Sequence, residues 1–151
     1  MVKIIWLPES NFTKSARAFD PRTLSIQRFE TWRVLVSLQR GYQDDPSHSL
    51  QHVKVMNMWR GKETWLVCFG MACSLEWEHR MDQKAELTEV FRKYLDTADL
   101  TQPFPSFVGD GSIMASHRSN LLPINPSYYQ DLYPGVVAGL EIAWPTQQKE
   151  S

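Results

Sequence analysis

Five consecutive polar residues, Ser116-His117-Arg118-Ser119-Asn120, form the densest cluster of hydrogen-bonding and ionisable side chains in the sequence. An Arg guanidinium binds phosphate through two parallel hydrogen bonds, and a His imidazole exchanges protons near neutral pH. The Ser and Asn side chains add short-range hydrogen bonds. The cluster therefore predicts a phosphate-binding site with a proton-transfer group. The alternative interpretation is a helix cap followed by a solvated turn.

A second cluster, Gln27, Arg28 and Glu30, lies in a segment with helical periodicity. On a wheel of about 100° per residue, Gln27 falls within the apolar stripe and Arg28 at its margin, while Glu30 falls on the less apolar side near Arg33. Buried polar groups need hydrogen-bond partners. The cluster is therefore either a structural hydrogen bond or ion pair, or a site on a helix that faces a cleft. We expect the two clusters to lie close together.

Metal and thiol chemistry find weaker support. His48 and His52, with Asp44-Asp45 nearby, resemble part of a metal site, but a zinc site usually needs three or four ligands on a firm scaffold, so we favour a solvated loop. Cys68 and Cys73 fall in one helical segment, where the helix keeps them too far apart for a disulfide, and we expect two reduced thiols. No phosphate loop, dinucleotide fingerprint or nucleophile elbow occurs in the sequence. We expect no metal and no cofactor.

These residues must be positioned by helices. Asp20-Pro21 is a cap followed by a proline in the first turn, Gly41 is a stop signal, and Asn125-Pro126 repeats the start signal. The segment 62–81 is apolar on nearly all sides, which is typical of a central buried helix. We predict one all-α domain of orthogonal helices spanning residues 1–151, with a tail frayed from about 146 and long irregular connections. The expected elements are an extended segment at 3–7, helices near 10–19, 21–39, 53–59, 62–81, 82–96, 113–122 and 126–133, a loop at 97–112 and an irregular or extended segment at 136–145.

The charge of the chain is unevenly distributed. The formal net charge is −1, yet residues 1–62 carry ten Lys and Arg against five Asp and Glu, and residues 63–151 carry six against twelve. The whole chain is therefore not a strongly basic general DNA binder. Arg22, Arg33 and Arg40 align on one side of the helix at 21–39, so the first part of the chain can present a basic face. Mutual attraction of the two parts within one fold is the alternative.

We find no signal peptide, and the longest apolar stretch, 65–73, is too short to span a bilayer. We therefore expect a cytoplasmic protein of a bacterial or phage-infected host cell, without membrane contact. We expect it to be a monomer or a weak homodimer.

Several sequence runs resemble those of a known family. They are LSIQRFE at 24–30, MWRG at 58–61, SHRSNLL at 116–122, NPSYYQDLYPG at 125–135 and AWP at 143–145. Together they resemble the pyrimidine-dimer DNA glycosylase-like family (endonuclease V-type) of small bacterial and phage proteins. The resemblance implies a compact helical glycosylase and lyase. In the founding enzyme the N-terminal amine is the nucleophile, assisted by a helix Glu that directly follows an Arg; here Phe29 separates Arg28 from Glu30.

These observations lead to one hypothesis and its alternatives. The chain is predicted to act on DNA or a nucleotide-like ligand, as a metal-independent N-glycosidase with or without lyase activity. Glu30 would stabilise the sugar cation or orient an amine nucleophile. The catalytic set is Glu30, Arg28 and His117, and the phosphate-binding set is Arg22, Gln27, Arg33, Ser116, Arg118, Ser119 and Asn120. The alternatives are a non-catalytic phage-type protein that sequesters a nucleotide or a host protein, and an interaction module that uses exposed aromatic residues.

Overall fold

The computed structural model describes residues 3–145, and the tail expected to fray from about 146 lies outside this range. Within the described residues the secondary structure is helical and contains no strand, which confirms the all-α prediction. The helices are α1 (Phe12–Ala18), α2 (Pro21–Gln39), α3 (Leu50–Trp59), α4 (Glu63–Met81), α5 (Glu86–Asp96), α6 (Gly111–Leu121) and α7 (Pro126–Leu132).

Local capping chemistry sets the helix starts. α2 and α7 begin at the prolines that follow Asp20 and Asn125, as the cap-then-proline signal predicts. α3 begins three residues before the expected position because the Ser49 side chain accepts the amide N–H of His52. α6 likewise begins two residues early, because Asp110 accepts the N–H of Ile113. The polar segments before both helices therefore contain their caps.

The loop between α4 and α5 was not predicted in full. The expected helix at 82–96 begins only at Glu86, because Asp82 adopts a left-handed conformation with φ of 51° and ends α4. A left-handed residue just after a helix cannot continue it, so the chain turns before α5 begins.

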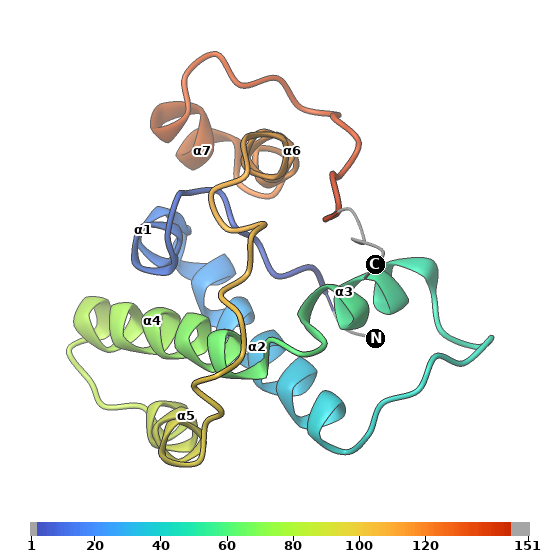
Figure 1. Cartoon of the computed structure of the whole chain (residues 1–151). Coiled ribbons are helices and arrows are strands. Elements are labelled where there is room, and N and C mark those ends of the chain that lie inside the picture. The colour runs from blue at the N-terminus through green and yellow to red at the C-terminus, as the bar shows by residue number, and fades with distance from the viewer. Residues whose placement is uncertain (1–2, 146–151) are drawn as a thin grey trace.

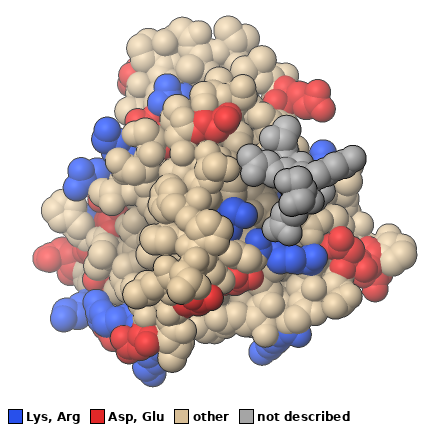
Figure 2. All heavy atoms as spheres, viewed as in Figure 1, with Lys and Arg blue, Asp and Glu red and all other residues tan. Residues whose placement is uncertain are grey.

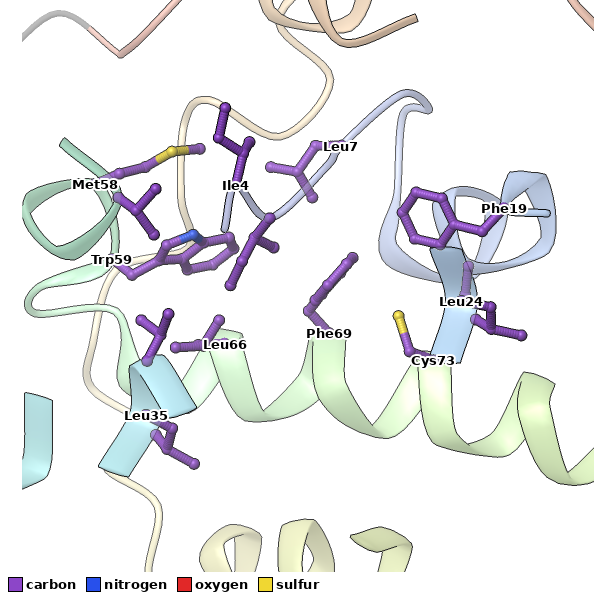
Figure 3. Close-up of a cluster of buried hydrophobic side chains, with 14 of the residues drawn as sticks. Ile4, Leu7, Phe19, Leu24, Leu35, Met58, Trp59, Leu66, Phe69 and Cys73 are labelled. Atoms are coloured by element: carbon purple, nitrogen blue, oxygen red, sulfur yellow. The ribbon is translucent and has the colours of Figure 1, made fainter. Parts of the chain in front are cut away.

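The core is built along α4. Figure 3 shows Leu66, Phe69 and Cys73 of this helix facing a cluster of buried side chains that includes Trp59 and Leu7. α4 packs against α1, α2 and α5. The α5 helix approaches closely at Gly70, where an added Cβ would lie 2.6 Å from the Phe91 ring, so glycine is required at this crossing. Leu75 on the outer side of α4 is exposed, so burial is not complete around this helix.

Two irregular segments complete the fold. Residues 3–9 run between α2 and α6 before the chain enters α1, and residues 136–145 pass α6 on their way from α7 (Figure 1). Among residues 3–145 no helix has the length and apolar character needed to cross a bilayer. The irregular course of residues 136–145 was expected from their sequence.

Candidate functional site

The first side of the candidate site is formed by α2, which holds the segment 3–9 through Gln27. The amide oxygen of Gln27 accepts the backbone N–H of Trp6 at 2.8 Å, and its amide nitrogen donates to the carbonyl of Ile4 at 2.9 Å. Gln27 is fully buried, and both ends of its side chain are occupied. The Gln27 side chain thus forms with the extended segment 3–9 the backbone hydrogen bonds that a neighbouring β-strand would otherwise form.

Glu30, one turn further along α2, is also buried. One carboxylate oxygen accepts the backbone N–H of Lys3 at 2.9 Å, and the other accepts from the Arg33 guanidinium at 3.1 Å. The Arg33 side chain is half exposed, so this ion pair lies at the surface end of the carboxylate. A carboxylate offers about four lone-pair positions, so two donors leave it able to accept further hydrogen bonds.

His117 holds the same segment from α6. Its Nδ1 accepts the backbone N–H of Leu7 at 2.8 Å, and the Trp6 ring meets the imidazole edge to face at 5.2 Å between centroids. Burial lowers the pKa of His117 to about 4, because a charged imidazole would lose its hydration. The ring is therefore neutral near pH 7, with Nδ1 as acceptor and the proton on Nε2.

Arg118 extends this contact by two residues. Its Nε donates to the carbonyl of Pro8 at 2.8 Å, and its Nη2 pairs with the Glu9 carboxylate at 2.5 Å. The guanidinium also lies 4.5 Å from the centre of the Tyr133 ring, and the Tyr133 hydroxyl donates to Glu9. The positive charge of Arg118 is thus already matched within the protein.

The three short polar residues of the same cluster hold the C-terminal irregular segment. Ser119 donates to the carbonyl of Val137 and accepts the N–H of Leu140, and Asn120 donates to the carbonyl of Leu140. Ser116 accepts the N–H of Ala143 at 3.0 Å. The five-residue cluster therefore divides its contacts, two residues on the segment 3–9 and three on the segment 137–143.

Arg28 lies apart from these residues. Its Nε donates to the Ser74 hydroxyl at 3.3 Å, and its guanidinium stacks 4.3 Å from the centre of the Trp77 ring of α4. Burial lowers the pKa of Arg28, although an Arg remains charged in proteins. The structure brings Gln27 and His117 to consecutive residues of one segment, Trp6 and Leu7, but directs Arg28 toward α4.

A cleft of about 630 Å³ lies beside the segment 3–9. It is bounded by α2, the start of α3, the connection between α6 and α7, and Ile142 of the C-terminal segment. Arg22, Gln27 and Asn120 of the predicted binding set line it, together with Lys3. Glu30 does not line the cleft, but its carboxylate accepts the backbone N–H of Lys3, which does.

Lys3 and Asn125 are lining residues that the sequence analysis missed. Lys3 stands 27 residues before Glu30 and follows no helical or motif spacing, so no local signal identifies it. A buried Gln27 within an apolar stripe was the available signal for an adjoining segment, since its amide needed backbone partners.

The ionisable side chains of the cleft favour an anion. Lys3 and Arg22 are cationic and exposed, whereas Asp20 is buried and accepts the Tyr129 hydroxyl at 2.7 Å. On the face shown in Figure 2, Lys and Arg side chains alternate with Asp and Glu across wide uncharged areas. Positive charge on this face is therefore local and forms no continuous basic surface.

The histidines considered for a metal site belong to an aromatic cluster. The rings of His48 and His52 lie 4.4 Å apart, and the Tyr42 hydroxyl lies 3.2 Å from Nδ1 of His48. Burial and the neighbouring His48 lower the pKa of His52. Within residues 3–145 no group of three His, Cys, Asp or Glu side chains is arranged to hold a metal ion.

Comparison with known proteins places the chain in a family. Residues 4–89, more than half of the chain, match the family model described as pyrimidine dimer DNA glycosylase. The match contains α2 with Gln27 and Glu30, and it ends before α6 and His117. No curated protein and no solved structure matches the chain. The match therefore covers most of the segment 3–9, the α2 helix that binds this segment, and most of the residues that line the adjoining cleft. The chain belongs to the pyrimidine dimer DNA glycosylase family.

Proposed function

We propose that this chain cleaves the N-glycosidic bond of a damaged pyrimidine in DNA, and that the reaction depends on Glu30. The observation that carries the proposal is the buried Glu30 carboxylate, which accepts the Lys3 N–H and the Arg33 guanidinium next to a cleft of about 630 Å³. Membership of the family supports DNA as the substrate.

A carboxylate near the sugar assists cleavage of an N-glycosidic bond. When the bond between C1′ of the sugar and the pyrimidine nitrogen breaks, the electron pair leaves with the base and the sugar becomes positively charged. A preorganised anion stabilises that charge without having to reorganise during the reaction. Glu30 is held in place by two donors and retains free lone pairs. The family resemblance adds an amine as the attacking group, which would form an imine at C1′ and lead to strand cleavage.

The remaining candidate residues are proposed to have different roles. We propose that Arg22 and Lys3 at the cleft, with the half-exposed Arg33, contact DNA phosphates. His117 and Arg118 use their polar atoms on the segment 3–9, so we propose that they position Lys3 beside Glu30 and do not bind phosphate themselves.

Ser116, Ser119 and Asn120 fix the segment that brings Ile142 to the cleft. We propose that Ser116 and Ser119 shape the cleft through this segment and act indirectly on DNA binding, whereas Asn120 also lines the cleft and contacts the ligand there. Arg28 contacts α4, and we propose that it stabilises the packing of α2 against α4.

The test uses a DNA duplex that contains one cyclobutane thymine dimer, with a chelator present. We expect the wild-type chain to release base or cut the damaged strand. Glu30→Gln should reduce the rate by about 100-fold, the scale of losing one charge-stabilising group. Glu86→Gln, an exposed carboxylate in α5, is the matched control and should retain full activity. Circular dichroism checks that both variants are folded.

Three results would contradict this mechanism. They are wild-type activity in Glu30→Gln, loss of wild-type activity to the chelator, and tight binding without release of any base. The last result would favour the sequestering alternative. Trapping with borohydride separates an amine nucleophile from water, because only an imine is reduced to a stable protein–DNA adduct.

A further inference from the structure

The outer ridge of α2 combines exposed apolar side chains with arginines. At about 100° and 1.5 Å per residue, the side chains of Arg22, Ile26, Phe29 and Arg33 leave the helix within an arc of about 60°, over about 16 Å of its length. Phe29 is 52% exposed, and Ile26 is half-buried and lines the cleft. About half of this large aromatic residue is thus exposed to solvent between two cationic residues.

The charge of this ridge suits a polyanion. Glu30 is the only acidic residue in α2, and its carboxylate is buried and paired with Arg33. Arg22 and Arg33 lie on either side of Phe29 with no carboxylate exposed among them. Glu30 offsets the charge of Arg33, but the half-exposed Arg33 guanidinium keeps N–H donors for a phosphate. In DNA, an aromatic base lies between two negatively charged phosphates. This order complements an aromatic ring between two cations, so DNA fits the ridge better than an apolar protein surface does.

The Phe29 ring is also supported from below. The Arg28 guanidinium lies 5.6 Å from the centre of this ring and 4.3 Å from the centre of the Trp77 ring of α4. Because Arg28 is buried and stacked on Trp77, it forms a fixed base against which Phe29 rests. A supported ring loses less conformational freedom when it stacks on a ligand.

We propose that Phe29 is a wedge that stacks on a DNA base next to the nucleotide bound in the cleft. It fills the space that opens when the damaged site is unstacked, as apolar side chains do in proteins that kink DNA. This inference rests on the proposed function, since it needs a DNA substrate, and it adds the residue that separates the bases. Arg22 and Arg33 supply the phosphate contacts on both sides of the wedge.

The experiment uses a duplex with a thymine dimer and a neighbouring 2-aminopurine, whose fluorescence rises when it is unstacked. Wild type, Phe29→Ala and Leu100→Ala are compared, and Leu100 is a matched control because it is 79% exposed and lies outside α2. We expect Phe29→Ala to raise the Kd by about ten-fold, the scale of one base–aromatic stack, and to remove the fluorescence rise at saturation. The dependence of Kd on salt should not change, because no phosphate contact is lost. Phe29→Trp should restore the fluorescence rise.

The outcomes separate the wedge from the proposed function. If Phe29→Ala matches wild type and Leu100→Ala in affinity and fluorescence while base release continues, the wedge is wrong and the glycosylase proposal is unaffected. If the wild-type chain neither binds the duplex nor releases base, the proposed function fails first. If Phe29→Ala changes only self-association, seen by sedimentation, the ridge is a contact between copies of this chain and the inference is overturned.

Discussion

His117 should make the protein lose stability as the pH falls from about 6.5 toward 4, and His52, whose pKa is also lowered, adds to the loss with the same sign. The imidazole accepts the N–H of Leu7 at 2.8 Å and has no room for a second proton at Nδ1. Burial lowers its pKa from 6.5 to about 4 in the folded protein. The unfolded chain therefore binds this proton first, and protonation favours unfolding.

The sign and the size follow from the two pKa values. Above about pH 6.5 His117 is neutral in both states and its effect on stability is constant. Between about pH 6.5 and 4 the free energy of unfolding should fall by roughly 1.4 kcal/mol per pH unit, which amounts to about 3 kcal/mol over the window. Asp20, whose pKa is lowered, adds a further loss only toward the acid end of this range, near its ordinary value of 3.8.

The assay is urea unfolding at half-unit steps from pH 7.5 to 4.5, with wild type, His117→Asn and His79→Asn. The amide oxygen of Asn can still accept the Leu7 N–H but does not titrate. His117→Asn should therefore be less stable at pH 7 through lost packing, yet flatter with pH than wild type. His79 is exposed on α4, so its replacement should leave the wild-type slope in place. Parallel curves for wild type and His117→Asn would refute the argument, because the acid sensitivity would then come from other groups.

Three further outcomes follow from the packing and the charges. Gly70→Ala should destabilise the fold by about 1–3 kcal/mol in denaturant unfolding, because a Cβ there would lie 2.6 Å from the Phe91 ring of α5. Gly111→Ala is the control and should be neutral or slightly stabilising, because no atom lies within 4 Å of the added Cβ. Gln27→Leu should cost at least about 2 kcal/mol by leaving two buried backbone groups unpaired, and hydrogen exchange should show faster exchange in residues 4–6 but not in α5. Replacing both Arg22 and Arg33 with Ala should flatten the log–log dependence of DNA affinity on salt by about two units, and an unchanged slope would show that neither residue contacts phosphate.

The helices were predictable where a local signal marks their ends. Asp20-Pro21 and Asn125-Pro126 give the starts of α2 and α7, because a cap and a proline act on the residues next to them. The starts of α3 and α6 were placed late, since Ser49 and Asp110 lie in polar stretches that also suit loops. The left-handed turn at Asp82 was not predicted, because this position lacks the glycine that usually marks such a helix end.

The site was predictable in its residues more than in its contacts. Gln27 and the 116–120 cluster stood out because polar side chains beside apolar stripes need partners. Their partners are backbone groups of segments far away in the sequence, such as Leu7 for His117 at a separation of 110 residues. Periodicity and spacing describe one helix or segment at a time. They therefore identify which polar residues are buried, but not which distant backbone group each of them binds.

The segment 3–9 is hydrogen-bonded to both α2 and α6, and this has a consequence for the order in which the chain folds. Gln27 can bind Ile4 and Trp6 once α2 has been synthesised, but Leu7 must wait for His117 and Pro8 for Arg118, each more than a hundred residues later. Closing such a long loop costs chain entropy before any contact stabilises it, which slows folding. The segment 3–9 is therefore synthesised more than a hundred residues before its last native partners and is among the last parts of the fold to acquire all of them.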